Sequence, residues 1–153
     1  MNILTTIACK LAQGLNGLGQ ILSQLGLRLL LAWEFGESGV EKLSGKNWFQ
    51  DIQAQFPPPF NAISPDLNWS LAIGTELLGA LALALGLGTR FAAFALIGLD
   101  IVAWIAVHAG NGYNVCENGF KLPLIYLIML IPLLLSGPGK ASLDHLIVKR
   151  LVG

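Results

Sequence analysis

Two acidic residues lie within long apolar stretches of this chain, where a carboxylate has little water to solvate it. Glu76 lies in LNWSLAIGTELLGALALAL, and Asp100 lies in FAAFALIGLDIVAWIAV. A charged side chain in hydrocarbon costs about 2.5–3.5 kcal/mol on insertion scales, so it needs a proton, a charged partner or a hydrated cavity. Carboxyls in such places can relay protons, bind a cation or accept hydrogen bonds from a polar headgroup.

The residues around Glu76 indicate which way its side chain points. Steps of four lead from Ala72 through Glu76, Ala80 and Ala84 to Gly88, and residues in such steps lie on one side of a helix. Small residues on that side allow a neighbouring helix to approach closely. We therefore expect Glu76 to face other helices and not the lipid.

A second polar stripe follows from Asp100, Trp104 and His108, which also recur in steps of four. At a rise of about 1.5 Å per residue, Glu76 lies about 10 Å below Trp69, and Asp100 lies about 12 Å below His108. Both acids therefore reach a similar depth. We expect Glu76 and Asp100 to point at each other across a helix interface.

Three further acids, Glu34, Glu37 and Glu41, share one face of the first apolar stretch, with Arg28 deeper and turned roughly the opposite way. Glu34 and Glu37 reach the layer of the two embedded acids, whereas Glu41 is interpreted as a solvated helix end. The outer half of the protein is thus expected to hold an acidic cluster drawn from three helices.

These residues make up the candidate site. Glu76 and Asp100 are the expected catalytic pair. The residues expected to bind a ligand or relay protons are Glu34, Glu37, Arg28, Trp104 and His108. A structural alternative stays open, in which Glu76 and Asp100 are protonated or paired with Arg28 and only fix helix packing. No metal site is expected, because no second histidine lies within metal-ligand spacing of His108.

The elements that carry these residues are predicted to be helices in a membrane. Hydrophobic residues make up 54% of the chain and charged residues 12%, which is outside the range of ordinary soluble domains. We predict an all-α fold, an integral membrane four-helix bundle with an N-terminal interfacial helix, in a single domain over residues 1–153. The predicted spans are about 18–43, 67–87, 91–109 and 120–136. The polar segment 44–66, which contains FPPPF, is expected to be an external loop.

Composition and motifs exclude several functions. The formal net charge is +0, and the absence of a basic stripe excludes a nucleic-acid binder. Cys9 and Cys116 have the spacing of neither a zinc site nor a redox pair. The chain has no haem, flavin or iron–sulfur pattern. Any electron transfer would therefore need a partner subunit or a bound redox-active molecule.

Lysine and arginine indicate the orientation in the membrane, because the cytoplasmic side retains the excess of these residues. One side is expected to carry Lys10, Arg90, Lys140, Lys149 and Arg150. The other side is expected to carry Lys42, Lys46 and Lys121. Both termini are therefore predicted to be cytoplasmic, in a multi-pass protein of the bacterial inner membrane.

Three stretches resemble the DoxX family of small bacterial membrane proteins. RLLLAWEFGESGVEKLSG resembles the opening arginine of the family and its Gly-x-x-Lys, here Arg28, Gly39 and Lys42. In the second stretch, PDLNWSLAIGTELLGALALALGLGTRFAAFAL, the matching residues are Glu76, Gly79, Gly86, Thr89 and Arg90. The third stretch, GPGKASLD, covers residues 137–144. The resemblance implies a four-helix membrane bundle that is associated with quinone-linked or thiol-linked oxidoreduction as a subunit of a larger assembly.

The functional hypothesis is a membrane subunit of a quinone-linked, respiratory-type oxidoreductase. Its intramembrane acids would bind a quinol headgroup or relay its protons, and quinone is the one expected cofactor. Expected partners are the lipid bilayer and either other membrane protein subunits or further copies of the chain. Two alternatives stay open: a non-catalytic accessory or assembly subunit of a larger membrane complex, and a membrane protein that binds cations through carboxylates.

Overall fold

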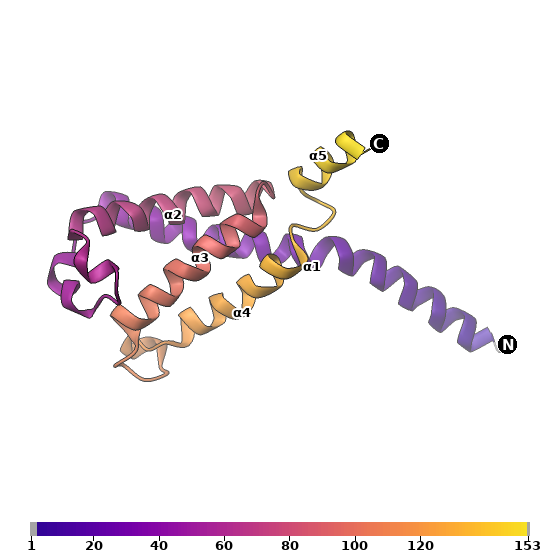
Figure 1. Cartoon of the computed structure of the whole chain (residues 1–153). Helices are drawn as coiled ribbons and strands as arrows, with labels where there is room; N and C mark the ends of the chain where they lie inside the picture. Colours follow the sequence, from indigo (N-terminus) through magenta and orange to yellow (C-terminus); the bar gives the residue numbers. More distant parts are fainter. Residues whose placement is uncertain (1–2, 153) are drawn as a thin grey trace.

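The computed structural model describes residues 3–152, and this part of the chain contains helices and loops without a β-strand (Figure 1). The longer helices are α1 (Ile3–Ser44), α2 (Pro65–Leu85), α3 (Thr89–Ala103), α4 (Lys121–Ser136) and α5 (Leu143–Val152). The shorter helical segments are η1 (Phe49–Gln55), η2 (Phe60–Ala62), η3 (Trp104–His108) and η4 (Val115–Glu117). The predicted all-α class is therefore confirmed for the described residues.

Membrane character is visible in the lengths and composition of the helices. Within residues 3–152, two helical stretches are long and apolar enough to cross a membrane, Pro65–Leu85 and Thr89–His108. The second consists of α3 and its continuation through η3, and the shorter α4 is also apolar. Packing contacts join α1 to α2, α2 to α3, and α3 to α4, while α4 returns to α1. These contacts close the four helices into a bundle.

Local sequence signals set the limits of α2. Ser64 caps its beginning, accepting a hydrogen bond from the amide of Leu67, and Pro65 occupies the first turn, where its missing amide hydrogen has no cost. Gly86, with φ of 66°, ends the helix in the left-handed conformation. The predicted span 67–87 therefore lies within two residues of the observed helix.

The beginning of the chain differs from the prediction. We expected an interfacial helix separated from a first span that begins near residue 18, but α1 continues without a break from Ile3 to Ser44. Glycine lowers helix stability by about 1 kcal/mol relative to alanine but does not terminate a helix by itself, so Gly14, Gly17 and Gly19 are accommodated. The first half of α1 projects away from the bundle (Figure 1).

The centre of the bundle is apolar. Leu31, Leu83, Leu96, Leu130 and Leu133 are each 0% exposed and pack together with residues from all four bundle helices. Close packing of α2 on α3 depends on Gly79, because a Cβ there would lie 2.9 Å from the Leu96 side chain. This core separates the two polar ends of the protein.

At the end near α5, Arg28 ties three segments together. Its guanidinium donates hydrogen bonds to the carbonyl oxygens of Leu83 (2.8 Å), Ala84 (3.1 Å), Pro138 (2.9 Å) and Ala141 (2.8 Å). Carbonyl groups in the last turn of a helix lack partners within that helix. Arg28 satisfies two of them at the end of α2 and fixes the segment that follows α4.

Asp144 completes this junction. Its carboxylate accepts hydrogen bonds from the amides of Gly88 (2.9 Å) and Thr89 (3.2 Å), and therefore caps the beginning of α3. Gly86 allows the close approach, because a Cβ there would lie 2.6 Å from the Ser142 Cβ. Helix α5, which begins at this junction, lies outside the predicted spans.

At the opposite end, the loop between α1 and α2 folds back onto the bundle. Phe49 and Phe56 are buried, with ring centroids 5.0 Å apart, and Phe49 lies 5.0 Å from the ring of Trp69. Helix η1 contacts both α2 and η3. The aromatic side chains of this loop therefore cover one end of the bundle.

Candidate functional site

A cavity of about 1030 Å³ opens between the bundle helices on the side of the aromatic loop. Its charged, hydroxyl and imidazole lining residues are Glu34, Glu37, Ser38, Glu41, Lys42, Thr75, Glu76, Asp100, His108 and Tyr126. They come from α1, α2, α3, η3 and α4. The structure thus brings Glu76 and Asp100, from neighbouring helices, to the wall of one cavity.

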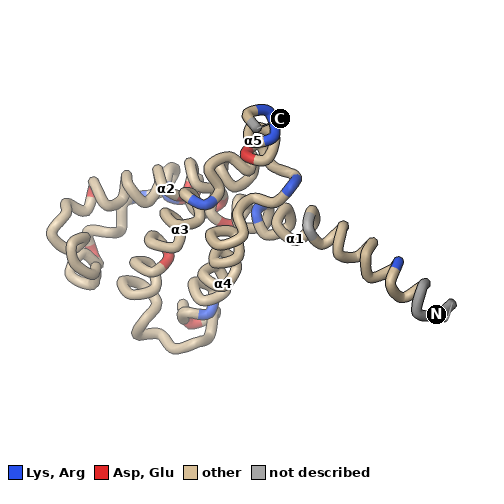
Figure 2. Tube along the Cα trace, turned by 45° about the vertical axis from the view of Figure 1, so that its right-hand side comes forward, with Lys and Arg blue, Asp and Glu red and all other residues tan. Residues whose placement is uncertain are grey.

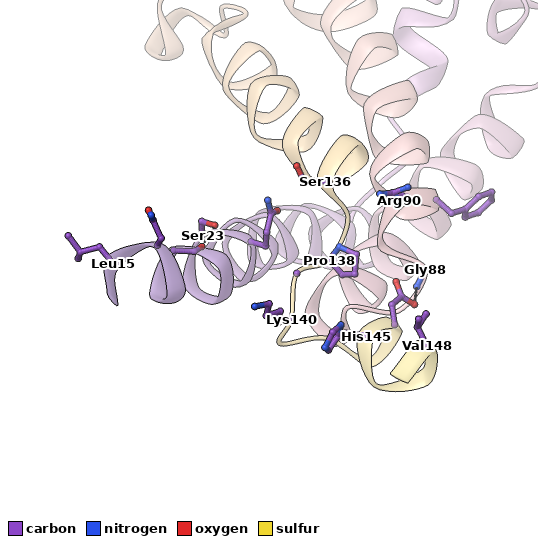
Figure 3. A pocket seen from close by; sticks show the side chains of 15 residues that line it. Leu15, Ser23, Gly88, Arg90, Ser136, Pro138, Lys140, His145 and Val148 are labelled. Carbon is purple, nitrogen blue, oxygen red and sulfur yellow. Dashed lines mark hydrogen bonds between the residues drawn. The ribbon is translucent and has the colours of Figure 1, made fainter. Parts of the chain in front are cut away.

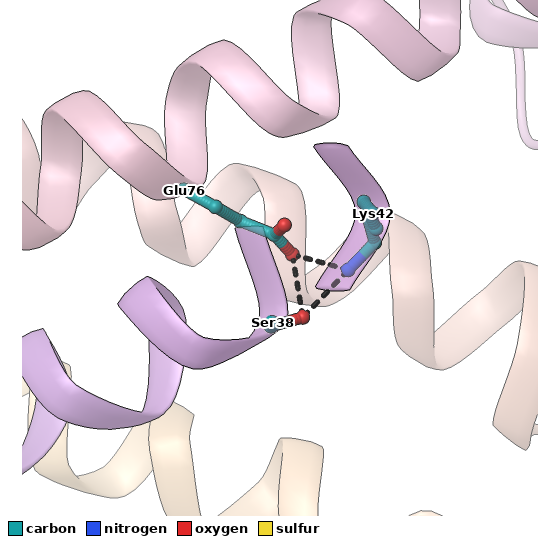
Figure 4. Close-up of polar contacts among 3 residues, drawn as sticks. All are labelled: Ser38, Lys42 and Glu76. Carbon is teal, nitrogen blue, oxygen red and sulfur yellow. Dashed lines mark hydrogen bonds and ion pairs between the residues drawn. The ribbon is translucent and has the colours of Figure 1, made fainter. Parts of the chain in front are cut away.

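Glu76 is 4% exposed and belongs to a three-residue polar cluster with Ser38 and Lys42 of α1 (Figure 4). The Lys42 ammonium lies 2.8 Å from Glu76 Oε1 and 2.6 Å from Ser38 Oγ. Ser38 Oγ in turn donates to Glu76 Oε1 at 3.2 Å. An ion pair that is this well buried lets a carboxylate stay inside an apolar bundle.

The close approach of α1 to α2 at this cluster depends on Gly39. A Cβ on Gly39 would lie 2.8 Å from Leu77 Cδ2 and 3.2 Å from Glu76 Cβ, both on α2. One turn away, a Cβ on Gly36 would lie at an ordinary 3.6 Å from Ala80 Cβ. Of the small residues predicted to face a neighbouring helix, Ala72 and Ala80 are buried, whereas Ala84 and Gly88 are exposed. The close approach at Gly39 brings Lys42 within reach of Glu76.

Asp100 is also 4% exposed, on the α3 side of the cavity. Its Oδ2 atom is buried and accepts no hydrogen bond from the residues that the structure describes. Glu76 Oε2 is in the same situation. A buried acceptor without a donor costs about 1–3 kcal/mol. The cavity wall therefore presents two acceptor oxygens that a ligand with hydroxyl groups would satisfy.

The remaining predicted acids line the cavity from α1. Glu34 is half-buried and accepts a hydrogen bond of 2.5 Å from the Tyr126 hydroxyl of α4. Glu37 is exposed at the opening, as is Glu41. His108 lines the cavity from η3, and its Nδ1 lies 2.7 Å from the carbonyl oxygen of Asn118.

Two predicted site residues do not line this cavity. Arg28 lies about 21 Å along α1 from Lys42 and binds the four carbonyl groups described above. Glu76 is therefore paired with Lys42 and not with Arg28, the partner that we considered from the sequence. Trp104 stacks on Phe120 instead, with ring centroids 5.1 Å apart and planes at 8°. The π-helical turn η3 begins at Trp104, whose amide still donates to the Asp100 carbonyl as in an α-helix.

Apolar side chains form the rest of the lining. Four aromatic rings come from the loop between α1 and α2, and they are Trp48, Phe49, Phe56 and Phe60. Val102 and Val107 contribute from the α3–η3 side. A cavity with polar groups on one side and rings on another fits an amphipathic or aromatic ligand.

The sequence reasoning missed Lys42 and Ser38 as partners of Glu76, and Tyr126 as the partner of Glu34. Lys42 was used only as an indicator of orientation and as part of the family resemblance. A local signal was present, because Ser38 and Lys42 are four residues apart and therefore lie on one face of the helix. No local signal marks Tyr126, since its partner lies 92 positions away.

The chemistry of this arrangement is hydrogen bonding and proton transfer. Carboxylates accept protons and hydrogen bonds, while the Lys42 ammonium donates them. The low exposure of Glu76 and Asp100 keeps bulk water from competing with a bound ligand. The site can therefore hold a ligand that carries both hydroxyl donors and carbonyl acceptors, and can exchange protons with it.

Comparisons with known proteins agree with the membrane fold. The DoxX family model matches residues 23–109, which is more than half of the chain. A protein of Haemophilus influenzae described as uncharacterized is 53% identical over 141 residues, covering 92% of this chain and 91% of the relative. A second uncharacterized protein of that organism is 35% identical over 78 residues, covering 49% and 58%. No solved structure matches. The chain belongs to the DoxX family.

Proposed function

We propose that this chain is a membrane subunit of a quinone-linked oxidoreductase, and that the cavity lined by Glu76 and Asp100 binds the quinone headgroup. The observation that carries the proposal is the pair of buried acceptor atoms, Glu76 Oε2 and Asp100 Oδ2, on the wall of one cavity. A quinol offers two hydroxyl donors on opposite sides of an aromatic ring. It therefore satisfies both acceptors while its ring contacts apolar side chains.

Residues of the same cavity can also bind the oxidised ligand, the quinone. A quinone has carbonyl oxygens in place of hydroxyl groups, and the Lys42 ammonium beside Glu76 is a donor for one of them. The aromatic residues of the loop, including Phe49 and Phe56, provide faces against which a planar ring stacks. Both redox states of the ligand thus find partners in this cavity.

The proton balance assigns roles to the two acids. Oxidation of a quinol to a quinone releases two protons and two electrons. Glu76 and Asp100 accept the protons, and the exposed Glu37 at the opening passes them to water. The electrons go to a redox centre in a partner subunit, because this chain has no haem, flavin or iron–sulfur sequence pattern.

The proposed setting is the bacterial inner membrane, with the second half of α1 and helices α2, α3 and α4 as four spans. The positive charges support this topology (Figure 2). The end that carries both termini has Lys10, Arg90, Lys140, Lys149 and Arg150. Because the cytoplasmic side retains the excess of lysine and arginine, both termini lie in the cytoplasm and the cavity lies toward the outer half.

The ion pair argues against the cation-binding alternative. Lys42 already neutralises Glu76 at 2.8 Å and would repel a cation there. Within the described residues, no group of three or more His, Cys, Asp or Glu side chains is arranged to hold a metal ion. An accessory role remains compatible with the quinone proposal, since the electrons require a partner subunit.

The proposal is tested by titrating the full-length protein in nanodiscs with a short-tailed quinol and following the quenching of tryptophan fluorescence. Trp48 lines the cavity and reports binding there. We expect Asp100→Asn to weaken binding at least tenfold, because a hydrogen bond to a charged acceptor contributes about 1.5–3 kcal/mol. Asp51→Asn, an exposed site on η1 outside the lining, is the matched control and keeps the wild-type affinity.

Thermal unfolding of the Asp100→Asn variant shows whether it keeps the wild-type fold. A folded variant with the affinity of the wild type would reject the role of Asp100. A wild-type protein without saturable quinol binding would reject the proposed function as a whole.

A further inference from the structure

A second hollow, of about 1200 Å³, lies at the end of the protein that carries both termini (Figure 3). Four segments surround it, and residues from each are labelled in the figure. The first half of α1 contributes Leu15, the beginning of α3 contributes Arg90, the turn after α4 contributes Lys140, and α5 contributes His145. We refer to this hollow as the basic groove.

Cationic groups of the basic groove lack acidic partners. Lys140 is exposed, and the structure records no hydrogen bond or ion pair from its ammonium to another described residue. Arg90 is exposed as well and donates to the Leu135 carbonyl at 3.2 Å, which leaves its other guanidinium hydrogens available. The groove therefore offers donors and positive charge to an anion.

Asp144 is the acidic residue on this lining, and it is already engaged. Its two oxygens accept the amide hydrogens of Gly88 and Thr89. The dipole at the beginning of α3 further compensates its charge. Asp144 therefore supports the shape of the groove and does not neutralise Lys140 or Arg90 by a direct ion pair.

Large apolar side chains border the same groove and remain exposed. Leu15 is 68% exposed, Phe91 79% and Val148 57%. Phe91 directly follows Arg90, so an exposed aromatic ring and a cation lie on the same helix turn. A small soluble anion would make no contact with these apolar side chains. A lipid carries a phosphate and acyl chains together, so it can contact both the basic and the apolar residues.

Helix α5 extends this pattern beyond the groove. Leu146, Ile147 and Leu151 are exposed by 55%, 46% and 80%, and Lys149 and Arg150 lie in its last turn. An apolar face flanked by basic residues is typical of a helix that lies in the interface of an anionic membrane. The groove thus lies between apolar spans and a helix of interfacial character.

We propose that the basic groove binds an anionic phospholipid, with its phosphate held by the basic residues Arg90 and Lys140 and its acyl chains against the exposed apolar residues at the border. Basic pockets between membrane helices on the cytoplasmic side recognise such headgroups. The occupant holds the first half of α1, the beginning of α3 and α5 against one another at the membrane surface. This site is separate from the quinone cavity, so either proposal can fail without the other.

The test is lipid binding to the delipidated full-length protein in a neutral detergent, measured by native mass spectrometry and by thermal stabilisation. The probes are phosphatidylglycerol, phosphatidylcholine and inorganic phosphate. We expect phosphatidylglycerol to bind and stabilise the protein in preference to phosphatidylcholine. Lys140→Gln weakens phosphatidylglycerol binding about fivefold, the effect of one basic residue near an anionic membrane surface.

Two variants sharpen the test. Lys140→Arg retains the charge and restores the affinity for phosphatidylglycerol, whereas Lys46→Gln, an exposed lysine at the opposite end, leaves it unchanged. Equal binding of the two lipids, or equal loss in Lys140→Gln and Lys46→Gln, would overturn the proposal. Inorganic phosphate that displaces the lipid at equal concentration would do the same, because the site would then recognise a free anion.

Discussion

Glu76 brings a negative charge into the apolar part of the bundle, and Lys42 is the residue that balances it. The ion pair is largely shielded from water, with side-chain exposures of 18% for Lys42 and 6% for Glu76. Removing one member of such a pair leaves the other charge without compensation, which costs more than the pair itself contributes. By contrast, Asp100 Oδ2 has no hydrogen-bond partner among the described residues. The two acids should therefore respond differently to mutation.

A double-mutant cycle measures this difference. We expect Glu76→Gln and Lys42→Met each to lower the free energy of unfolding, with a coupling energy of about 1.5–3 kcal/mol between them. Asp100→Asn removes a buried charge without a recorded partner, so it should not lower the free energy of unfolding as Glu76→Gln and Lys42→Met do. Reversible unfolding in mixed micelles provides the free energies. A coupling energy near zero would show that the ion pair is absent in solution.

The sequence identified Glu76 and Asp100 because an acid inside an apolar helix is visible without knowledge of the fold. It also placed Glu34 and Glu37 on the correct face, because helical periodicity is local. The partners Lys42 and Tyr126 depend on how separate helices align in depth and rotation, which periodicity does not fix. Arg28 was expected deeper in the bundle, as a site residue or a partner of the embedded acids, but carbonyl groups bind it at the opposite end.

At the scale of the helices, the contact between α1 and α2 controls the position of the polar cluster. The two backbones come close at Gly39, where a methyl group would collide with Leu77. Since Lys42 lies one turn further along α1, the spacing of the helices sets its distance to Glu76. The glycine therefore acts on the candidate site through packing.

Gly39→Ala tests this dependence. Overpacking a close contact costs about 1–3 kcal/mol, and the gain in helix propensity of about 1 kcal/mol offsets part of it. We expect a net loss of up to about 2 kcal/mol in unfolding free energy together with weaker quinol binding. Gly74→Ala is the matched control, because a Cβ there meets nothing within 4 Å. A Gly39→Ala protein that gains stability as Gly74→Ala does would contradict the close contact.

Helix limits were predictable where the sequence carries a stop or start signal. Gly86 ends α2, and the proline-containing loop separates α1 from α2. The continuity of α1 was not predictable, because its glycines weaken a helix without defining an end. The π-helical turn that begins at Trp104 has no sequence signature either.

The whole molecule has two polar ends with different chemistry, separated by a leucine-rich core. One end holds the cavity with Lys42, Glu76 and Asp100, and the other holds Arg28 and the basic groove. The residues that carry the family resemblance divide between these ends, so one group builds the site and the other fixes the fold. The sequence pattern does not show which residues belong to which end, because both groups contain charged residues and glycines.

The two cysteines test the proposed orientation without added labels. Cys9 and Cys116 are both free and exposed, on the first half of α1 and in η4. We expect a membrane-impermeant maleimide to modify Cys116 in intact spheroplasts, and Cys9 only after permeabilisation. Cys9→Ser and Cys116→Ser assign the signals by peptide mass. Modification of both cysteines from the outside would contradict cytoplasmic termini.

The central claim is that the cavity beside Glu76 and Asp100 holds a quinone headgroup, and photoaffinity labelling tests it most directly. The full-length protein in nanodiscs is irradiated with an azido-quinone, and the labelled peptides are identified by mass spectrometry. We predict labels within residues 71–76 and 94–103, two segments that contribute residues to the cavity lining, with displacement by excess quinone and loss in Asp100→Asn. Labels confined to the exposed outer surface at Leu78 and Leu81, undiminished by competing quinone, would contradict the account.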